Sequence, residues 1–181
     1  MNNNNYHLKN KFLNMRFNYI SLLTVLLLVL VSSGLDIKAQ ITIHEDGLYY
    51  DEYERWYTGV YVEKYPDGVV KAQISIKKGK KDGLMKLFYP DGSINELRMY
   101  KNNLMHGTWE TFNNKGIKTA EANYSLDEKN GKWYIWDENG TLRYDMTYFE
   151  GDKAGTWYMW DEKGDLIGAK EYELNPHLKK K

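Results

Sequence analysis

Apolar and polar positions repeat along most of this chain with a fixed period of 24 residues. Two columns of glycines mark the period, and the second column lies nine residues after the first. The first column consists of Gly59, Gly83, Gly107, Gly131 and Gly155. The second column consists of Gly68, Gly92, Gly116, Gly140 and Gly164. A constant period of about 20 to 50 residues is typical of repeat architectures, so we expect five tandem units over residues 59–176.

Large apolar residues follow the same period. Two residues after the first glycine stand Tyr61, Met85, Trp109, Trp133 and Trp157. Five residues after it stand Lys64, Phe88, Phe112, Trp136 and Trp160. Eight residues after the second glycine stand Ile76, Tyr100, Tyr124, Tyr148 and Tyr172. Each unit therefore carries its own set of aromatic side chains at fixed places.

Turn residues divide each unit into two strands. The second glycine follows segments such as Pro66-Asp67, and Pro-Asp-Gly is turn chemistry because glycine takes the positive φ that the turn needs. A second turn is expected where small or αL-tolerant residues share a column. These residues are Gly79, Asn103, Asp127, Gly151 and Asn175. We expect both glycine columns to close turns, so each repeat is a β-hairpin.

The second strand of a repeat alternates cleanly, as Leu142, Tyr144, Met146 and Tyr148 show. Such a period of two is expected of a strand with one buried face. The first strand, residues 133–136, is apolar on both faces. Either a β-bulge re-aims one residue, or one Trp column packs on something outside the sheet. Both explanations are open from the sequence.

The predicted fold is all-β, an elongated single sheet built from five 24-residue hairpins, with almost no helix. Residues 40–58 lack the glycine pair and are interpreted as an N-terminal cap, because terminal units of a repeat array are atypical. Residues 177–181 form a basic tail.

The first 39 residues are interpreted as a secretory signal peptide. Residues 20–31 form a run of uncharged, mainly apolar residues, preceded by Arg16, and they are short of the roughly 20 residues that a membrane span needs. We expect cleavage after Ala39, and the true start could be Met15. An uncleaved N-terminal anchor is the alternative. The mature protein is expected to be secreted or periplasmic.

The chain contains no cysteine, which excludes disulfides, thiolate metal sites and a cysteine-linked lipid anchor. Residues 40–181 carry 21 basic and 24 acidic side chains, so they lack the excess of positive charge that is typical of nucleic-acid-binding proteins. His44, His106 and His177 lie in different settings, and the acidic residues gather at turns, where solvation explains them. We therefore predict no catalytic residues, no metal site and no cofactor.

Aromatic columns are the feature with binding potential. One column is proposed as a candidate binding surface because flat rings suit sugars or the apolar patch of a partner protein. It consists of Phe88, Phe112, Trp136 and Trp160. The competing interpretation is that these rings form the core between hairpins. Trp133 and Trp157 share a face with apolar neighbours and are assigned to that core.

The segments 131–142 and 155–166 resemble MORN-repeat variants, the tandem repeats of bacterial proteins often labelled YwqK-type antitoxins. The resemblance covers about residues 46–174 and implies an antiparallel sheet of hairpins that serves as a scaffold. The pattern Gly-Lys-Trp-Tyr-x-Trp-Asp-x-x-Gly is also similar to choline- and glucan-binding cell-wall repeats, whose period is shorter. We hypothesise an exported, non-catalytic scaffold that binds an envelope or secreted protein. A carbohydrate-binding module is the alternative, followed by an antitoxin-like protein or an enzyme.

Overall fold

The computed structural model describes residues 40–173, which form strands and turns and contain no helix. The predicted signal peptide, Asn175 and the basic tail lie outside the described residues. The strands are β1 (Thr42–Ile43), β2 (Tyr49–Tyr50), β3 (Gly59–Lys64), β4 (Val70–Lys77), β5 (Lys80–Phe88), β6 (Ile94–Lys101), β7 (Leu104–Phe112), β8 (Lys118–Ser125), β9 (Glu128–Lys129), β10 (Gly131–Trp136), β11 (Leu142–Phe149), β12 (Asp152–Trp160) and β13 (Leu166–Tyr172).

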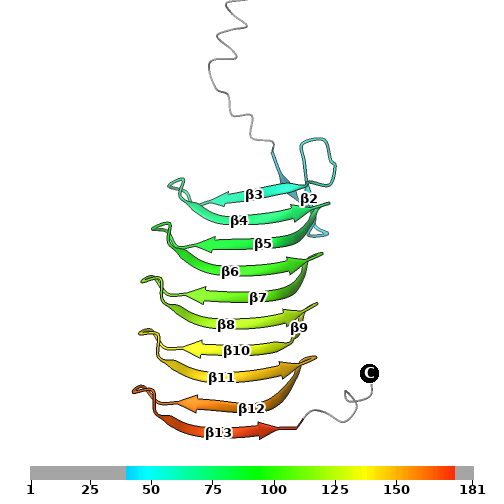
Figure 1. The fold of residues 1–181 in the computed structure, drawn as a ribbon. Coiled ribbons are helices and arrows are strands. Elements are labelled where there is room, and N and C mark those ends of the chain that lie inside the picture. Colours follow the sequence, from blue (N-terminus) through cyan, green and yellow to red (C-terminus); the bar gives the residue numbers. More distant parts are fainter. Residues whose placement is uncertain (1–39, 174–181) are drawn as a thin grey trace, which may run out of the picture. The chain divides into compact units, whose positions relative to one another are not determined.

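One large antiparallel sheet holds β3 to β13 in chain order, so each strand pairs with its neighbours in sequence (Figure 1). The short strand β9 pairs with β8, and β10 continues along β8 after a break. The repeats correspond to the hairpins β3–β4, β5–β6, β7–β8, β10–β11 and β12–β13. The prediction of an all-β array of hairpins is therefore confirmed. β1 and β2 form a separate hairpin within residues 40–58.

Two kinds of turn alternate along the sheet. At one end of the strands, five-residue loops contain the second glycine column. In the first loop Gly68 N donates to Tyr65 O at 2.9 Å, and Asp67 Oδ1 accepts from Val69 N. At the other end of the strands, two-residue turns have positive φ at both central residues, as at Asn102 (52°) and Asn103 (71°). Positive φ at both positions is typical of type I′ hairpins, whose twist suits a right-handed strand pair.

The first glycine column lies within strands, which differs from the expectation that it closes turns. In β7, Trp109 pairs with Arg98 and Met105 pairs with Tyr100, so residues 106–108 face Met99 alone. Gly107 sits in this bulge with φ of 80°, and a Cβ there would lie 3.3 Å from Met99 Cβ. The glycine is needed both for the positive φ of the bulge and for close strand contact.

A second irregularity lies opposite the end of the first strand, but it does not re-aim the tryptophan of that strand. Ile135 pairs with Tyr144 and Trp136 pairs with Leu142, so β11 holds one extra residue at Arg143. The same shift recurs at Phe88, Phe112 and Trp160. Trp133 and Trp136 lie on opposite faces of the sheet, because they are three positions apart in an extended strand. Since Leu142 pairs with Trp136, it lies on the face of Trp136, and the prediction that it shares a face with Tyr144 is wrong.

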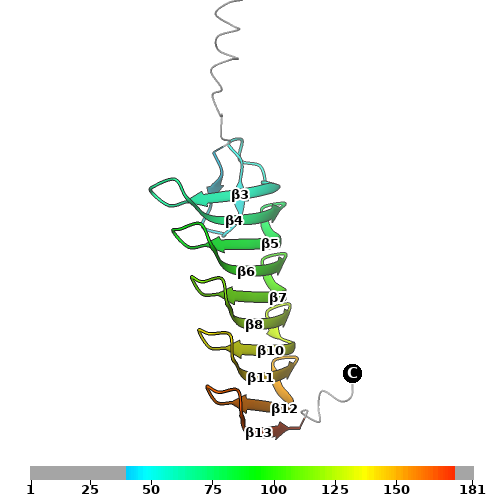
Figure 2. The same ribbon diagram turned by 60° about the vertical axis from the view of Figure 1, so that its left-hand side comes forward.

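The main cluster of buried side chains is small and lies at the β3–β4 end. Within residues 40–173 the buried hydrophobic side chains are Tyr49, Ala72, Ile74, Ile76, Tyr100 and Ala154. Tyr49 of β2 packs on the β4 residues, and Tyr61 and Met85 pack around them. Farther along, the sheet is a single layer with both faces open (Figure 2). Within the described residues we find no helical segment with the length and hydropathy that a membrane crossing requires.

Candidate interaction surfaces

One face of the sheet carries a continuous ladder of seven aromatic rings. Consecutive rings come from neighbouring strands, with centroids 4.7 to 5.3 Å apart and mostly tilted planes. Such edge-on geometry is favourable for aromatic pairs. In chain order the ladder consists of Tyr100, Trp109, Tyr124, Trp133, Tyr148, Trp157 and Tyr172.

The tryptophans of the ladder are fixed by hydrogen bonds. Each indole Nε1 donates to a backbone carbonyl of the preceding repeat: Trp109 to Met99 O, Trp133 to Asn123 O and Trp157 to Thr147 O, at 2.9 to 3.0 Å. The ladder rings after Tyr100 are only half-buried, and burial raises the pKa of the Tyr124 and Tyr148 phenols. The ladder therefore serves as the core of the array although one side faces solvent.

Cations lie on the ladder. Lys81 Nζ is 4.6 Å from the Tyr100 centroid, Lys129 Nζ is 4.6 Å from that of Trp133, and Lys153 Nζ is 4.6 Å from that of Trp157. These lysines occupy one column, two residues before the first glycine. In cation–π contacts of this kind, the charged amine is attracted to the face of the aromatic ring.

The four residues predicted as a binding surface lie on the opposite face and are half-buried. The Trp136 ring contacts Tyr134, with centroids 5.5 Å apart, and Trp160 contacts Tyr158 at 5.9 Å. Lys118 Nζ lies 5.8 Å from the Trp136 centroid and forms ion pairs with Glu110 and Glu121. No ring pair joins one repeat to the next on this face in the described part of the chain.

The predicted binding surface did not include Tyr134 and Tyr158. Each tyrosine stands two positions before a tryptophan of that surface, Trp136 or Trp160, and so lies on the same face. We call Tyr134, Trp136, Tyr158 and Trp160 the terminal aromatic face. Phe88 and Phe112 continue the same column toward β3, but the residues two positions before them, Lys86 and Glu110, are charged.

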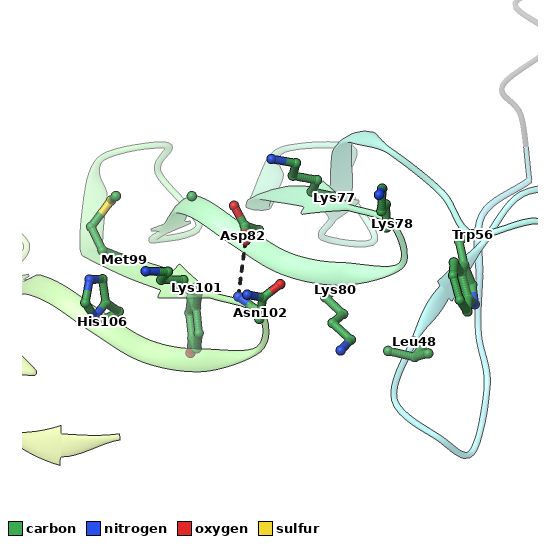
Figure 3. A pocket seen from close by; sticks show the side chains of 12 residues that line it. Leu48, Trp56, Lys77, Lys78, Lys80, Asp82, Met99, Lys101, Asn102 and His106 are labelled. Carbon is green, nitrogen blue, oxygen red and sulfur yellow. Dashed lines mark hydrogen bonds between the residues drawn. The ribbon is translucent and has the colours of Figure 1, made fainter. Parts of the chain in front are cut away.

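A cavity of about 810 Å³ lies between residues 48–56 and the type I′ turns after β4 and β6 (Figure 3). Lys77, Lys78, Lys80 and Lys101 line it, and Asp82 accepts a hydrogen bond from Asn102 N at 3.2 Å. Leu48, Trp56, Met99, Tyr100 and His106 complete the wall. Three of these lysines stand around Gly79 in residues 77–80, which is the sequence signal for positive charge at this turn.

The histidines do not gather into a site. His44 Nε2 lies 3.2 Å from Glu54 Oε2 at the surface, whereas His106 lines the cavity, and its Nδ1 is buried without a hydrogen-bond partner. Within residues 40–173 there is no group of three or more acidic, cysteine or histidine side chains that could hold a metal ion. His177 lies outside the described residues.

The family model described as the MORN repeat variant matches residues 81–102 and 129–150. The chain therefore contains this repeat at two places. The first match covers most of the β5–β6 hairpin, and the second covers the β10–β11 hairpin together with Lys129. MORN repeats are a non-catalytic repeat type and generally mediate protein or membrane interactions. No curated protein matches the chain.

Proposed function

We propose that this protein is an exported, non-catalytic scaffold that binds another protein at the cell envelope. The single observation that carries the proposal is the open, single-layer sheet, which leaves aromatic side chains half-exposed on both faces from β7 to β13. A protein that needed only stability would gain by covering such rings. The MORN repeat matches support an interaction role, and the signal-like N-terminus supports export.

The terminal aromatic face is the better candidate for the partner's contact. The inner rings of the ladder each contact two neighbouring rings, and the indoles of its tryptophans donate to backbone carbonyls. Trp136 and Trp160, by contrast, each contact a single aromatic ring. Tryptophan and tyrosine dominate interface hot spots because they supply a large contact area at little conformational cost.

Charge and exposed apolar groups extend this face. Leu166 in β13 pairs with Trp160, so it lies on the same face, and it is 57% exposed. Lys118 and its two glutamates provide a polar margin beside Trp136. An apolar centre with a charged margin is the usual composition of a protein interface.

Site-specific photo-crosslinking in the producing cells tests the proposal. A crosslinking amino acid at position 136 or 160 should yield a discrete protein adduct, whereas one at Val62 should not. Val62 is a matched control because it is 43% exposed and lies in the first repeat, on the same face by strand parity. Adducts of equal yield from all three positions, or none from 136 and 160, would contradict the proposal.

A carbohydrate-binding module is the second candidate, because half-exposed rings at regular spacing also suit sugar rings. A glycan array with the purified protein separates the two. Binding of a defined glycan that is lost in the Trp136→Ala/Trp160→Ala variant, and kept in a Val60→Ala/Val62→Ala variant, would favour the glycan. Val60 and Val62 are exposed and belong to the first repeat, so the control removes apolar area at the far end of the array.

A further inference from the structure

The cavity beside the first two type I′ turns has an unusual charge balance. Four of its lining residues are lysines, Lys77, Lys78, Lys80 and Lys101, and one is an acid, Asp82. The chain as a whole has equal numbers of basic and acidic residues. The excess of positive charge is therefore local, and a concave site lined by one sign of charge attracts ligands of the opposite sign.

These four ammonium groups form no ion pair and no cation–π contact within residues 40–173, which sets them apart from many lysines of the sheet. Lys71, Lys118 and Lys132 pair with carboxylates, with Nζ to oxygen distances of 2.7 to 2.9 Å for Glu63, Glu121 and Asp145. Lys81, Lys129 and Lys153 lie on aromatic rings. The cavity lysines are available to an external anion.

Backbone bonds fix the turn that carries three of the lysines. Gly79 N donates to Tyr57 O at 2.8 Å, Tyr49 N donates to Gly79 O at 2.9 Å, and Lys78 N donates to Thr58 Oγ1 at 2.9 Å. Gly79 is buried, and a Cβ there would lie 3.3 Å from the Trp56 ring. Residues 49–58 therefore fix the backbone of the turn from which Lys77, Lys78 and Lys80 extend, so the position of this charge is set by the fold.

The remaining wall defines the rest of the ligand. Trp56, 61% exposed, and Leu48 stand at one end of the cavity, and Met99 and His106 stand at the other (Figure 3). A volume of about 810 Å³ is in the range of small-molecule sites, roughly 300 to 1,000 Å³. Four lysines against one aspartate suit an anion with more than one charge, and lysine is an established point-charge partner of phosphate.

We propose that this cavity binds a small, soluble phosphate ester. The phosphate is bound by the exposed lysines that line the cavity, and the organic group lies against Trp56 and Leu48. The site involves the first two repeats and residues 48–56, so it is separate from the terminal aromatic face and independent of the proposed function.

Calorimetric titration of the full-length protein with phenyl phosphate at low ionic strength tests the proposal. We expect saturable one-site binding, with amide shifts in NMR spectra confined to the turns at residues 78 and 102 and to the Trp56 indole. The Lys78→Gln/Lys80→Gln/Lys101→Gln variant should bind at least about tenfold more weakly, because each lost ammonium–phosphate contact removes a charge-assisted hydrogen bond. The Lys64→Gln/Lys115→Gln/Lys163→Gln variant removes the same charge near the other turns and should keep its affinity within about twofold.

Further ligands distinguish a soluble phosphate ester from inorganic phosphate and from a phospholipid headgroup. Inorganic phosphate should bind more weakly than phenyl phosphate, and Trp56→Ala should reduce this difference. Equal loss of binding in both triple variants would show a diffuse charge effect and overturn the site. Binding to vesicles containing phosphatidic acid, without binding of phenyl phosphate, would assign the lysines to a membrane surface and also overturn it. No binding by the correctly folded wild type would do the same.

Discussion

Tyr124 and Trp133 belong to different repeats, and their rings meet edge to face with centroids 5.2 Å apart. Tyr124 lies in β8 and Trp133 in β10, and the Trp133 indole donates to Asn123 O beside Tyr124. The apolar contact that stabilises one hairpin is thus completed by the next hairpin. An isolated two-stranded hairpin is only marginally stable in water, so this pairing explains why the units occur in tandem.

Trp133→Ala should destabilise the protein by about 2–3 kcal/mol, somewhat less than a fully buried tryptophan, because the ring is half-exposed. The variant loses contacts with Tyr124 and Tyr148 and one hydrogen bond. Trp136→Ala is the matched control on the other face and should cost less, since its ring contacts Tyr134 alone among aromatic rings. Urea unfolding measures both, and a larger loss for Trp136→Ala would reverse the assignment of the two faces.

The hairpin array was predictable because its signals are local. The second turn column fixes its strand ends through αL-tolerant residues, and the alternation of Tyr144, Met146 and Tyr148 fixes which side chains share a face. The role of Gly107 was not predictable in the same way. A glycine with positive φ serves a turn or a bulge equally well, and the choice depends on pairing with Met99 across the sheet.

Tyr89→Phe should destabilise the protein by about 1 kcal/mol, because the Tyr89 hydroxyl donates to Phe112 O of the next repeat at 2.8 Å. The variant leaves that carbonyl without the donor and keeps the ring. Tyr144→Phe, at a residue that is 42% exposed, should change stability by less than about 0.5 kcal/mol. Thermal melts of the two variants check the difference, and equal melting temperatures would show that the bond contributes nothing.

The first residue of each five-residue loop makes different hydrogen bonds along the array. Tyr65 and Tyr89 bond to the following repeat, and Asn113 does so through Glu138 while also accepting from Ile117 N in its own loop. Asp137 and Asp161 accept only from their own loops among the bonds in the described chain. The first three junctions are therefore joined at this end of the strands by the first loop residue. At the fourth junction Arg143 of β11 takes this role, because its Nε donates to Trp160 O at 2.9 Å.

Acid should weaken the loop that Asp137 closes. A hydrogen bond from Thr141 N holds the pKa of the Asp137 carboxyl below its usual value, with further help from Asn139 N and the Arg143 charge. Because the pKa is lower in the folded state, the stabilisation is complete above about pH 5 and is lost as the pH falls through about 4 and below. The stability advantage of wild type over Asp137→Ala, from urea unfolding at several pH values, should shrink over that range. Asp137→Asn keeps an oxygen acceptor and does not titrate, so it should lack this part of the acid sensitivity.

The candidate sites were predictable only in part. The parity of Trp133 and Trp136 placed them on opposite faces, and the column of Phe88 to Trp160 could be read from the period alone. The lysine cavity could not, because it needs Trp56 and Leu48 beside a turn that lies more than 20 residues later. That contact depends on the bonds of Gly79 with Tyr49 and Tyr57, which no repeat pattern encodes.

Deletion of residues 107–130, one whole period, should leave a shorter protein that still unfolds cooperatively. The deletion joins His106 to Gly131, which occupies the place of Gly107, so β7 continues as β10 and Tyr100 meets Trp133 in place of Trp109. In the described chain each repeat contacts mainly its neighbours, and such arrays lose stability roughly in proportion to the units removed. Deletion of residues 107–118 removes one strand and its loop, reverses the direction of every following strand and leaves β8 without its partner. Circular dichroism melts should show a cooperative transition for the first deletion and loss of most β-structure for the second, and two equally unfolded proteins would contradict the hairpin as the unit of stability.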